Sequence, residues 1–240
     1  MAIETLELEN EAPTRGESLA DQVYRKLSAA ILSGTFAPNE RITIRRLAED
    51  WNMSVTPARE AVLRLISEEI LQLTDRNAVV VPTRSESEIQ EIFEIRRGIE
   101  GSLAAKAAPL LDANDLAFLV RTQEAFLHAI KERDYKEALR CNARFHFRIY
   151  RRPSLPLHLK LVEGLWLRIG PTLRNMYPIL QGHPDRRRRH DDIMDCVRAR
   201  DPEGLKAAVI ADLETSEIAL YRFIAQVTRE ARRPVARRSR

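Results

Sequence analysis

Near the N-terminus, apolar side chains recur every three to four positions in three separate stretches of the chain. This spacing is typical of helices with one buried face and predicts helices over residues 18–33, 44–51 and 56–68. Ser18 stands where a capping residue is preferred, and Gly34 suits the C-terminal cap of the same helix. Three short amphipathic helices cannot each form a core alone, so we expect them to pack together.

Two short apolar runs follow these helices, at residues 71–74 and 79–82, and a polar tip at 75–77 separates them. Such runs around an Asp/Asn tip predict a β-hairpin. Helix, helix, turn, helix and hairpin, in that order, is the plan of the winged helix-turn-helix, which places a reading helix in the major groove of DNA. The pattern also allows a small helical domain with a protein-binding face.

From residue 86 onward the pattern is helical, interrupted by Pro, Asp and Gly. The predicted helices cover residues 86–108, 112–132, 134–151, 156–180, 184–200 and 202–228. Helices joined by short links favour an antiparallel bundle. The sequence therefore predicts a mainly α protein: an N-terminal winged helix-turn-helix domain over 18–83 and a C-terminal all-helical antiparallel bundle over 84–228. A flexible arm over 1–17 and a basic disordered tail over 229–240 complete the prediction.

Charge and composition narrow the class of protein. The chain has 240 residues and a net charge of +4; the arm carries five acids against one arginine, whereas residues 229–240 carry six arginines against one glutamate. The net positive charge thus comes largely from the tail and by itself says little about nucleic-acid binding. No apolar run reaches the roughly 18 residues that span a bilayer. Two cysteines argue against a secreted disulfide scaffold, so we expect a cytoplasmic protein without a membrane partner.

Short motifs resemble a known family. Residues 54–61 read SVTPAREA and follow RRLAE at 45–49, which resembles the reading-helix signature of GntR-type transcription regulators. Three further stretches resemble the FadR-like branch, whose all-helical ligand-binding domain is called FCD: residues 93–97 with Glu100, residues 142–146 and residues 190–194. These pieces occur in the family's order across residues 18–228.

The resemblance implies a homodimer that binds a double-stranded DNA operator with two half-sites under the control of a small metabolite. Carried over, the DNA-contacting positions are Arg45, Ser54, Thr56, Arg59, Arg76 and Asn77. Arginine can contact guanine with two hydrogen bonds, and hydroxyls at a helix start suit phosphates; a solvated surface charge is the alternative for Arg59. Val55 stands where many relatives have arginine. Asn77 replaces a common glycine at the wing tip, and asparagine tolerates positive φ.

Polar residues on apolar helical stripes indicate a site inside the bundle, because burying them unpaired is costly. They are Asn142 and His146 on the third bundle helix, His190 on the fifth and Asp212 on the sixth. Nitrogen and oxygen donors of this kind suit zinc, nickel, manganese or iron. Metal-binding relatives have Asp or Asn and then three histidines here, so Asp212 replaces an imidazole. Hydrogen-bonded core residues without a metal are the alternative.

An inward-facing arginine predicts the ligand. Arg96 shares the apolar stripe of the first bundle helix, so we expect it to clamp the carboxylate of a small organic acid bound at the metal, with Arg97 as the alternative clamp. Two histidines and a carboxylate also form the ligand set of some metal-dependent enzymes, but no HExxH-like motif accompanies them. A scaffold that binds partner helices is a third possibility. We expect a metabolite-responsive regulator and not an enzyme.

Overall fold

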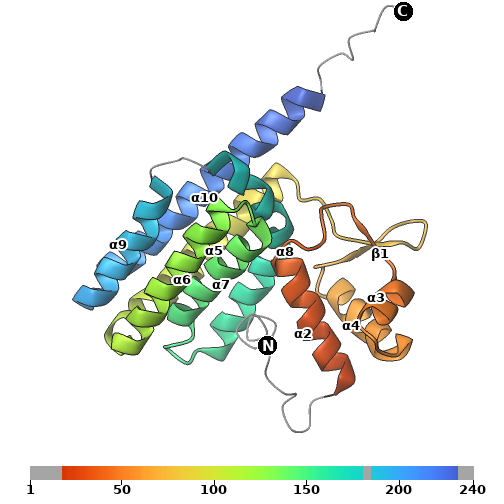
Figure 1. Cartoon of the computed structure of the whole chain (residues 1–240), viewed down its shortest axis with the longest axis horizontal. Helices are drawn as coiled ribbons and strands as arrows, with labels where there is room; N and C mark the ends of the chain where they lie inside the picture. Colours follow the sequence, from red (N-terminus) through yellow and green to blue (C-terminus); the bar gives the residue numbers. More distant parts are fainter. Residues whose placement is uncertain (1–17, 181–184, 232–240) are drawn as a thin grey trace, which may run out of the picture.

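The computed structural model describes residues 18–180 and 185–231 and shows two parts side by side (Figure 1). The N-terminal part contains three helices and three short strands: α2 (Leu19–Leu32), β1 (Arg41–Ile42), α3 (Ile44–Asp50), α4 (Val55–Ser67), β2 (Gln72–Leu73) and β3 (Val79–Val80). The bundle contains α5 (Glu86–Ala107), the 3-10 turn η1 (Ala108–Leu110), α6 (Ala113–Lys131), α7 (Tyr135–Tyr150), α8 (Pro156–Leu180), α9 (Asp185–Ala199) and α10 (Pro202–Ala231). The mainly α fold class is confirmed.

Local signals explain the N-terminal part. The Ser18 side chain accepts a hydrogen bond from the backbone N–H of Asp21, 3.1 Å away, and Gly34 ends α2 with φ +65°. Asn77 adopts φ +55° at the hairpin tip, as its tolerance of that conformation predicts. The hairpin pairs β2 with β3, but β1 pairs with the other side of β3, in the order β1-β3-β2. This third strand was not predicted, because two residues are too short to show an alternating pattern.

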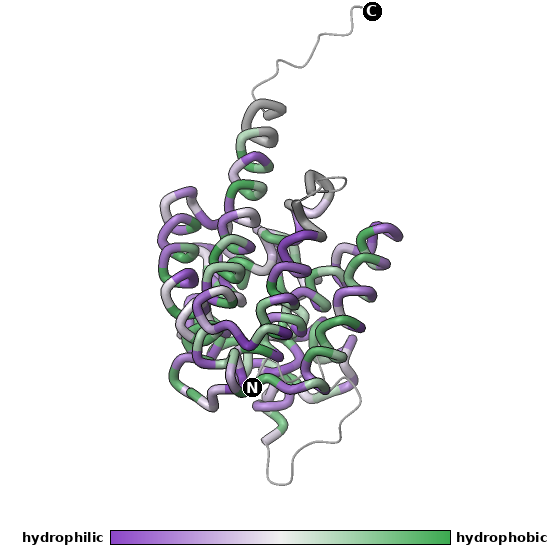
Figure 2. Tube along the Cα trace, turned by 90° about the vertical axis from the view of Figure 1, so that its left-hand side faces the viewer, coloured by the Kyte–Doolittle hydropathy of each residue, from purple (hydrophilic) through white to green (hydrophobic). Residues whose placement is uncertain are grey.

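The bundle follows the predicted helices to within one or two residues at most ends. In it α5 packs on α10, α6 packs on α7, and α9 contacts both α6 and α10. Hydrophobic and hydrophilic residues interleave along the helices (Figure 2), as expected for amphipathic helices with one buried face. The helix α10 continues to Ala231, beyond its predicted end and into the predicted tail, because residues 229–231 carry no stop signal before Pro234.

The remaining terminal predictions, the arm over 1–17 and the tail from residue 232, lie outside the described residues. Within the part of the chain that the structure describes, no helix has the length and apolarity needed to cross a bilayer.

The helix α8 joins the two parts. A Cβ atom at Gly170 would stand 2.8 Å from the backbone oxygen of Leu32, so α2 lies directly on the α8 backbone at this point. Arg168 donates to the backbone oxygen of Glu68 at 2.7 Å, and Arg174 donates to that of Gly34 at 2.6 Å. The ends of α2 and α4 are therefore held by one helix of the bundle.

Replacing Gly170 with alanine is expected to lower the free energy of unfolding by about 1–3 kcal/mol, because the added methyl must push two backbones apart. Chemical denaturation measures this change. Gly98→Ala is the matched control, since a Cβ there meets no atom within 4 Å; alanine at this helical position should leave stability equal or higher by up to about 1 kcal/mol. Equal losses at both glycines would show that α2 does not rest on Gly170.

Candidate DNA interface and metal centre

The predicted DNA-contacting residues all lie exposed on the N-terminal part: Arg45 on α3; Ser54, Thr56 and Arg59 at the start of α4; Arg76 and Asn77 at the hairpin tip. Ser54 is the N-cap of α4, with φ −73° and ψ 155°, yet its side chain makes no capping hydrogen bond. Its hydroxyl and the first amide groups of α4 are thus available to an anion. Val55, next to Ser54 in the first turn of α4, is 40% exposed.

Three predicted metal ligands converge inside the bundle from three helices. His146 on α7, His190 on α9 and Asp212 on α10 each offer one ligand atom, and these atoms lie within 4.8 Å of one another. Both imidazoles are buried, and the carboxylate is 14% exposed. Asn142 lies half-buried one turn before His146 on the same helix. The donor set is one that divalent transition metals accept.

The hydrogen bonds around His146 fix which nitrogen faces Asp212. The Tyr150 hydroxyl lies 2.7 Å from Oε2 of Glu100 and 3.2 Å from Nδ1 of His146. A hydroxyl has one proton, and when it donates that proton to the carboxylate its oxygen accepts from Nδ1–H. Nε2 of His146 then faces Oδ2 of Asp212 at 3.2 Å. A ring nitrogen and a carboxylate oxygen at this distance are joined either by a hydrogen bond, with the proton on Nε2, or by a metal ion that both ligate.

His190 has a matching arrangement. Its Nδ1 lies 2.5 Å from Oε1 of Gln123, and its ring stacks on Phe145 with centroids 4.1 Å apart. A metal-binding histidine commonly donates its second N–H to such an oxygen, which orients the ring and leaves the other nitrogen for the metal. Nε2 of Gln123 is buried and has no hydrogen-bond partner among the described residues. This donor suits an oxygen atom of a bound ligand.

Arg96 points inward, as its place on the stripe predicts, but it is paired there. Its Nε donates to Oε1 of Glu100 at 2.6 Å, and its guanidinium lies 4.5 Å from the Trp166 ring centroid. Nε1 of Trp166 also donates to Glu100, at 3.1 Å. Arg97 lies outside this group, in an ion pair with Glu217. A continuous set of contacts thus links Arg96, through Glu100 and Tyr150, to His146.

Glu100, Tyr150 and Gln123 also belong to the site, although the sequence did not predict them there. Two of them had a usable signal: Glu100 follows Arg96 by four positions and Tyr150 follows His146 by four, so each shares a helix face with its partner. Gln123 had none, because its proximity to His190 depends on how α6 packs against α9.

Electrostatics keep the Asp212 carboxylate ionised. Burial by itself raises the pKa of Asp212, but the hydrogen bond from His146 and the charges of His146, His190 and Arg96 outweigh it and hold the pKa below its ordinary value. Burial and the charge of Glu100 raise the pKa of Tyr150 well above its ordinary value, so its hydroxyl stays protonated. An ionised carboxylate facing two imidazoles attracts a cation.

Comparison with known proteins shows the family of this chain. A model described as bacterial regulatory proteins of the gntR family matches residues 19–81, and the FCD domain model matches residues 91–215. The chain belongs to the GntR family. The FCD domain puts this GntR-family protein in the FadR-like branch, as the sequence motifs predict, and it is a DNA-binding transcription regulator with a helical ligand-binding domain.

Relatives of this GntR-family regulator carry matching names. The HTH-type transcriptional regulator McbR of Escherichia coli K12 is 31% identical over 208 residues, which cover 85% of this chain and 93% of that protein. The solved structure of E. coli McbR/YncC has a TM-score of 0.79 at 29% identity and covers 86% of this chain and 98% of its own. The HTH-type regulator YdhC of Bacillus subtilis is 31% identical over 126 residues, covering 52% of this chain and 56% of YdhC. These names are those of regulators and not of enzymes, so the enzyme alternative is set aside.

Proposed function

We propose that this GntR-family regulator binds, as a homodimer in the cytoplasm, an operator with two half-sites, and that a small organic acid controls the affinity. DNA binding is assigned to residues 18–83 and acid binding to residues 84–228. The observation that carries the proposal is the convergence of His146, His190 and Asp212 inside the ligand-binding domain. It supports a divalent metal ion as the anchor of the acid.

The residues present fit such an ion. Nε2 of His146, a nitrogen of His190 and a carboxylate oxygen of Asp212 would hold it, and the amide oxygen of Asn142 is the proposed fourth ligand. Zinc, nickel, manganese and iron accept this set. When bound, the ion supplies positive charge that one carboxylate ligand only partly neutralises, and so attracts the carboxylate of the acid. Nε2 of Gln123 would donate to the acid, and Arg96 is the proposed charged partner on α5.

The helix α8 provides a route from the acid to the DNA. Trp166 contacts Glu100 and the Arg96 guanidinium at the site, while Gly170, one turn further along α8, touches the backbone of α2. Arg174 holds the end of α2 from the same helix. An acid that displaces Trp166 would therefore shift the two parts relative to each other. Coupling of this kind is typically about 1–3 kcal/mol.

Replacing Arg59 with alanine tests the DNA interface. We expect operator affinity to fall by roughly 10–100-fold, since a bidentate hydrogen bond from arginine to guanine contributes about 1–3 kcal/mol of discrimination. Binding is measured on a sequence selected from random duplexes, at one fixed salt concentration. Arg121→Ala, which removes the same charge from the exposed side of α6, is the control and should bind nearly as the parent does. A parent protein that binds no sequence above the non-specific level would refute the proposal.

A further inference from the structure

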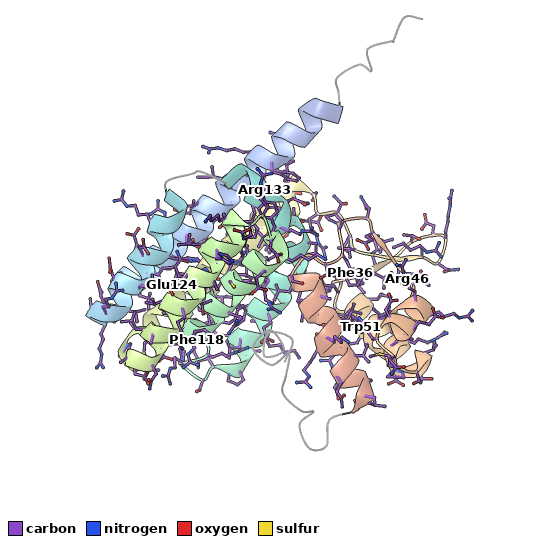
Figure 3. All side chains as sticks on the ribbon, in the orientation of Figure 1. Phe36, Arg46, Trp51, Phe118, Glu124 and Arg133 are labelled. Carbon is purple, nitrogen blue, oxygen red and sulfur yellow. The ribbon has the colours of Figure 1, made fainter. Side chains whose placement is uncertain are left out.

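A cleft opens between α2, the segment around β1 and α3, and Arg140 of α7 lines its bundle side. Its volume is about 680 Å³. Phe36, Arg46 and Trp51 lie together on this side of the N-terminal part, between α2 and α3 (Figure 3). The cleft is separate from the cluster of His146, His190 and Asp212, and the proposed function makes no use of it.

The cleft carries an excess of positive charge. Four cations line it against two acids; the cations are Lys26, Arg41, Arg46 and Arg140, of which Arg140 also pairs with Glu137 at 2.8 Å. One of the acids, Glu40, already accepts a hydrogen bond from the backbone of Ala37 at 2.8 Å, and the other, Asp50, faces Arg46 at 3.6 Å. Arg41 is exposed, and within the described residues no ion pair includes it. An anionic segment would therefore be attracted here.

The cleft also offers apolar and backbone contacts. Phe36 and Trp51 line it, with Lys26 placed 4.6 Å from the Trp51 ring centroid. The strand β1 lines it too and lies at an edge of the sheet, since β3 alone pairs with it among the described strands. Edge strands accept an additional extended segment through backbone hydrogen bonds. The surface thus suits an extended chain that alternates acidic and apolar residues.

The arm over residues 1–17 has these properties. Leu6 and Leu8 alternate with Glu7 and Glu9, and the arm carries five acids against one arginine, a net charge of −4. It joins α2 at Ser18, and Lys26 lies eight residues along that helix, a rise of about 12 Å. An extended chain spans about 3.3 Å per residue, so the arm is long enough to return along α2 to the cleft.

We propose that the acidic arm docks in this cleft as an extended segment. Its glutamates pair with Lys26, Arg41 and Arg46, and its leucines contact Phe36 and Trp51. Because the cleft reaches Arg140 on α7, the docked arm bridges the DNA-binding part and the bundle, and it places negative charge beside α3.

Acrylamide quenching of tryptophan fluorescence tests the docking. The chain contains two tryptophans; Trp166 is 1% exposed and serves as an internal unquenched reference, whereas Trp51 lines the cleft. A chain in which Met1 is followed directly by Ser18 keeps the cap of α2. We expect its Trp51 to lose protection and to be quenched more strongly than in the full chain.

Two further comparisons separate docking from altered folding. A full-length variant with Glu4, Glu7, Glu9 and Glu11 replaced by glutamine should lose the same protection, and so should Arg41→Glu, whereas Arg121→Glu on the distant helix α6 should not. A free peptide of residues 2–17 should restore protection to the shortened chain near the roughly millimolar effective concentration that a short tether supplies. The same peptide with its glutamates replaced by glutamine should not restore the protection. Equal quenching of the full and shortened chains, or equal rescue by both peptides, would overturn the proposal.

Discussion

Replacing Glu100 with alanine is expected to lower the free energy of unfolding by about 3–5 kcal/mol, the cost of leaving a buried charge without its partner. Arg96, 2% exposed, would lose the carboxylate that its Nε contacts at 2.6 Å. Tyr150 and Trp166 would lose their acceptor at the same time. Urea denaturation, with the midpoint and slope both fitted, measures the loss.

A control pair joins the same helix α5 to α10. Glu217→Ala breaks its ion pair with Arg97, which is 27% exposed and can be solvated, so the loss should stay below about 1 kcal/mol. Adding Arg96→Met to Glu100→Ala removes the stranded charge and should recover part of the stability. If Glu100→Ala cost no more than Glu217→Ala, the buried pair would not be the support of the site that its geometry indicates.

The second large effect concerns metal binding. Replacing His146 with alanine removes one of three converging donors, so affinity for zinc or nickel should fall by more than the roughly 10–100-fold that loss of an outer partner costs. Calorimetric titration of the metal-free protein measures the affinity. His128→Ala, on the exposed side of α6, should bind as the parent protein does. Equal affinity in all three proteins would place any metal elsewhere.

Acidification should release the metal. Imidazoles bind metals only when neutral, so affinity should decline on mild acidification, before the carboxylate is protonated. The depressed pKa of Asp212 means that its carboxylate is still ionised in this range. Its own contribution to folded-state stability is present above the ordinary carboxyl pKa and is lost only as the pH falls through the lowered value. A decline that began only in that more acidic range would assign the binding to the carboxylate alone.

Local signals in the sequence were enough to predict most elements. Ser18 and Gly34 mark the two ends of α2. In the bundle, helical periodicity predicts the helices, and prolines and glycines mark where one helix ends and the next begins. The apolar helical stripes also predict inward-facing positions for Arg96, His146 and His190, which are buried. These features depend on residues close together in the chain, where spacing determines direction.

Features that depend on packing between distant segments could not be predicted. The strand β1 is defined only by its partner β3, and the close approach of α2 to Gly170 depends on how the two parts meet. Gln123 is recognisable as a member of the site only once α6 is placed beside α9. The cleft beside α3 likewise combines α2 with a residue of α7.

Operator affinity, measured with and without a divalent metal and a panel of small carboxylic acids, tests the central claim most directly. We predict that at least one acid changes the affinity of the parent protein by about 5–150-fold, the usual range of such coupling. The change should require the metal and disappear in His146→Ala, while DNA binding itself persists in that variant. Operator affinity that responds equally to the same acid in the parent and in His146→Ala would contradict the account.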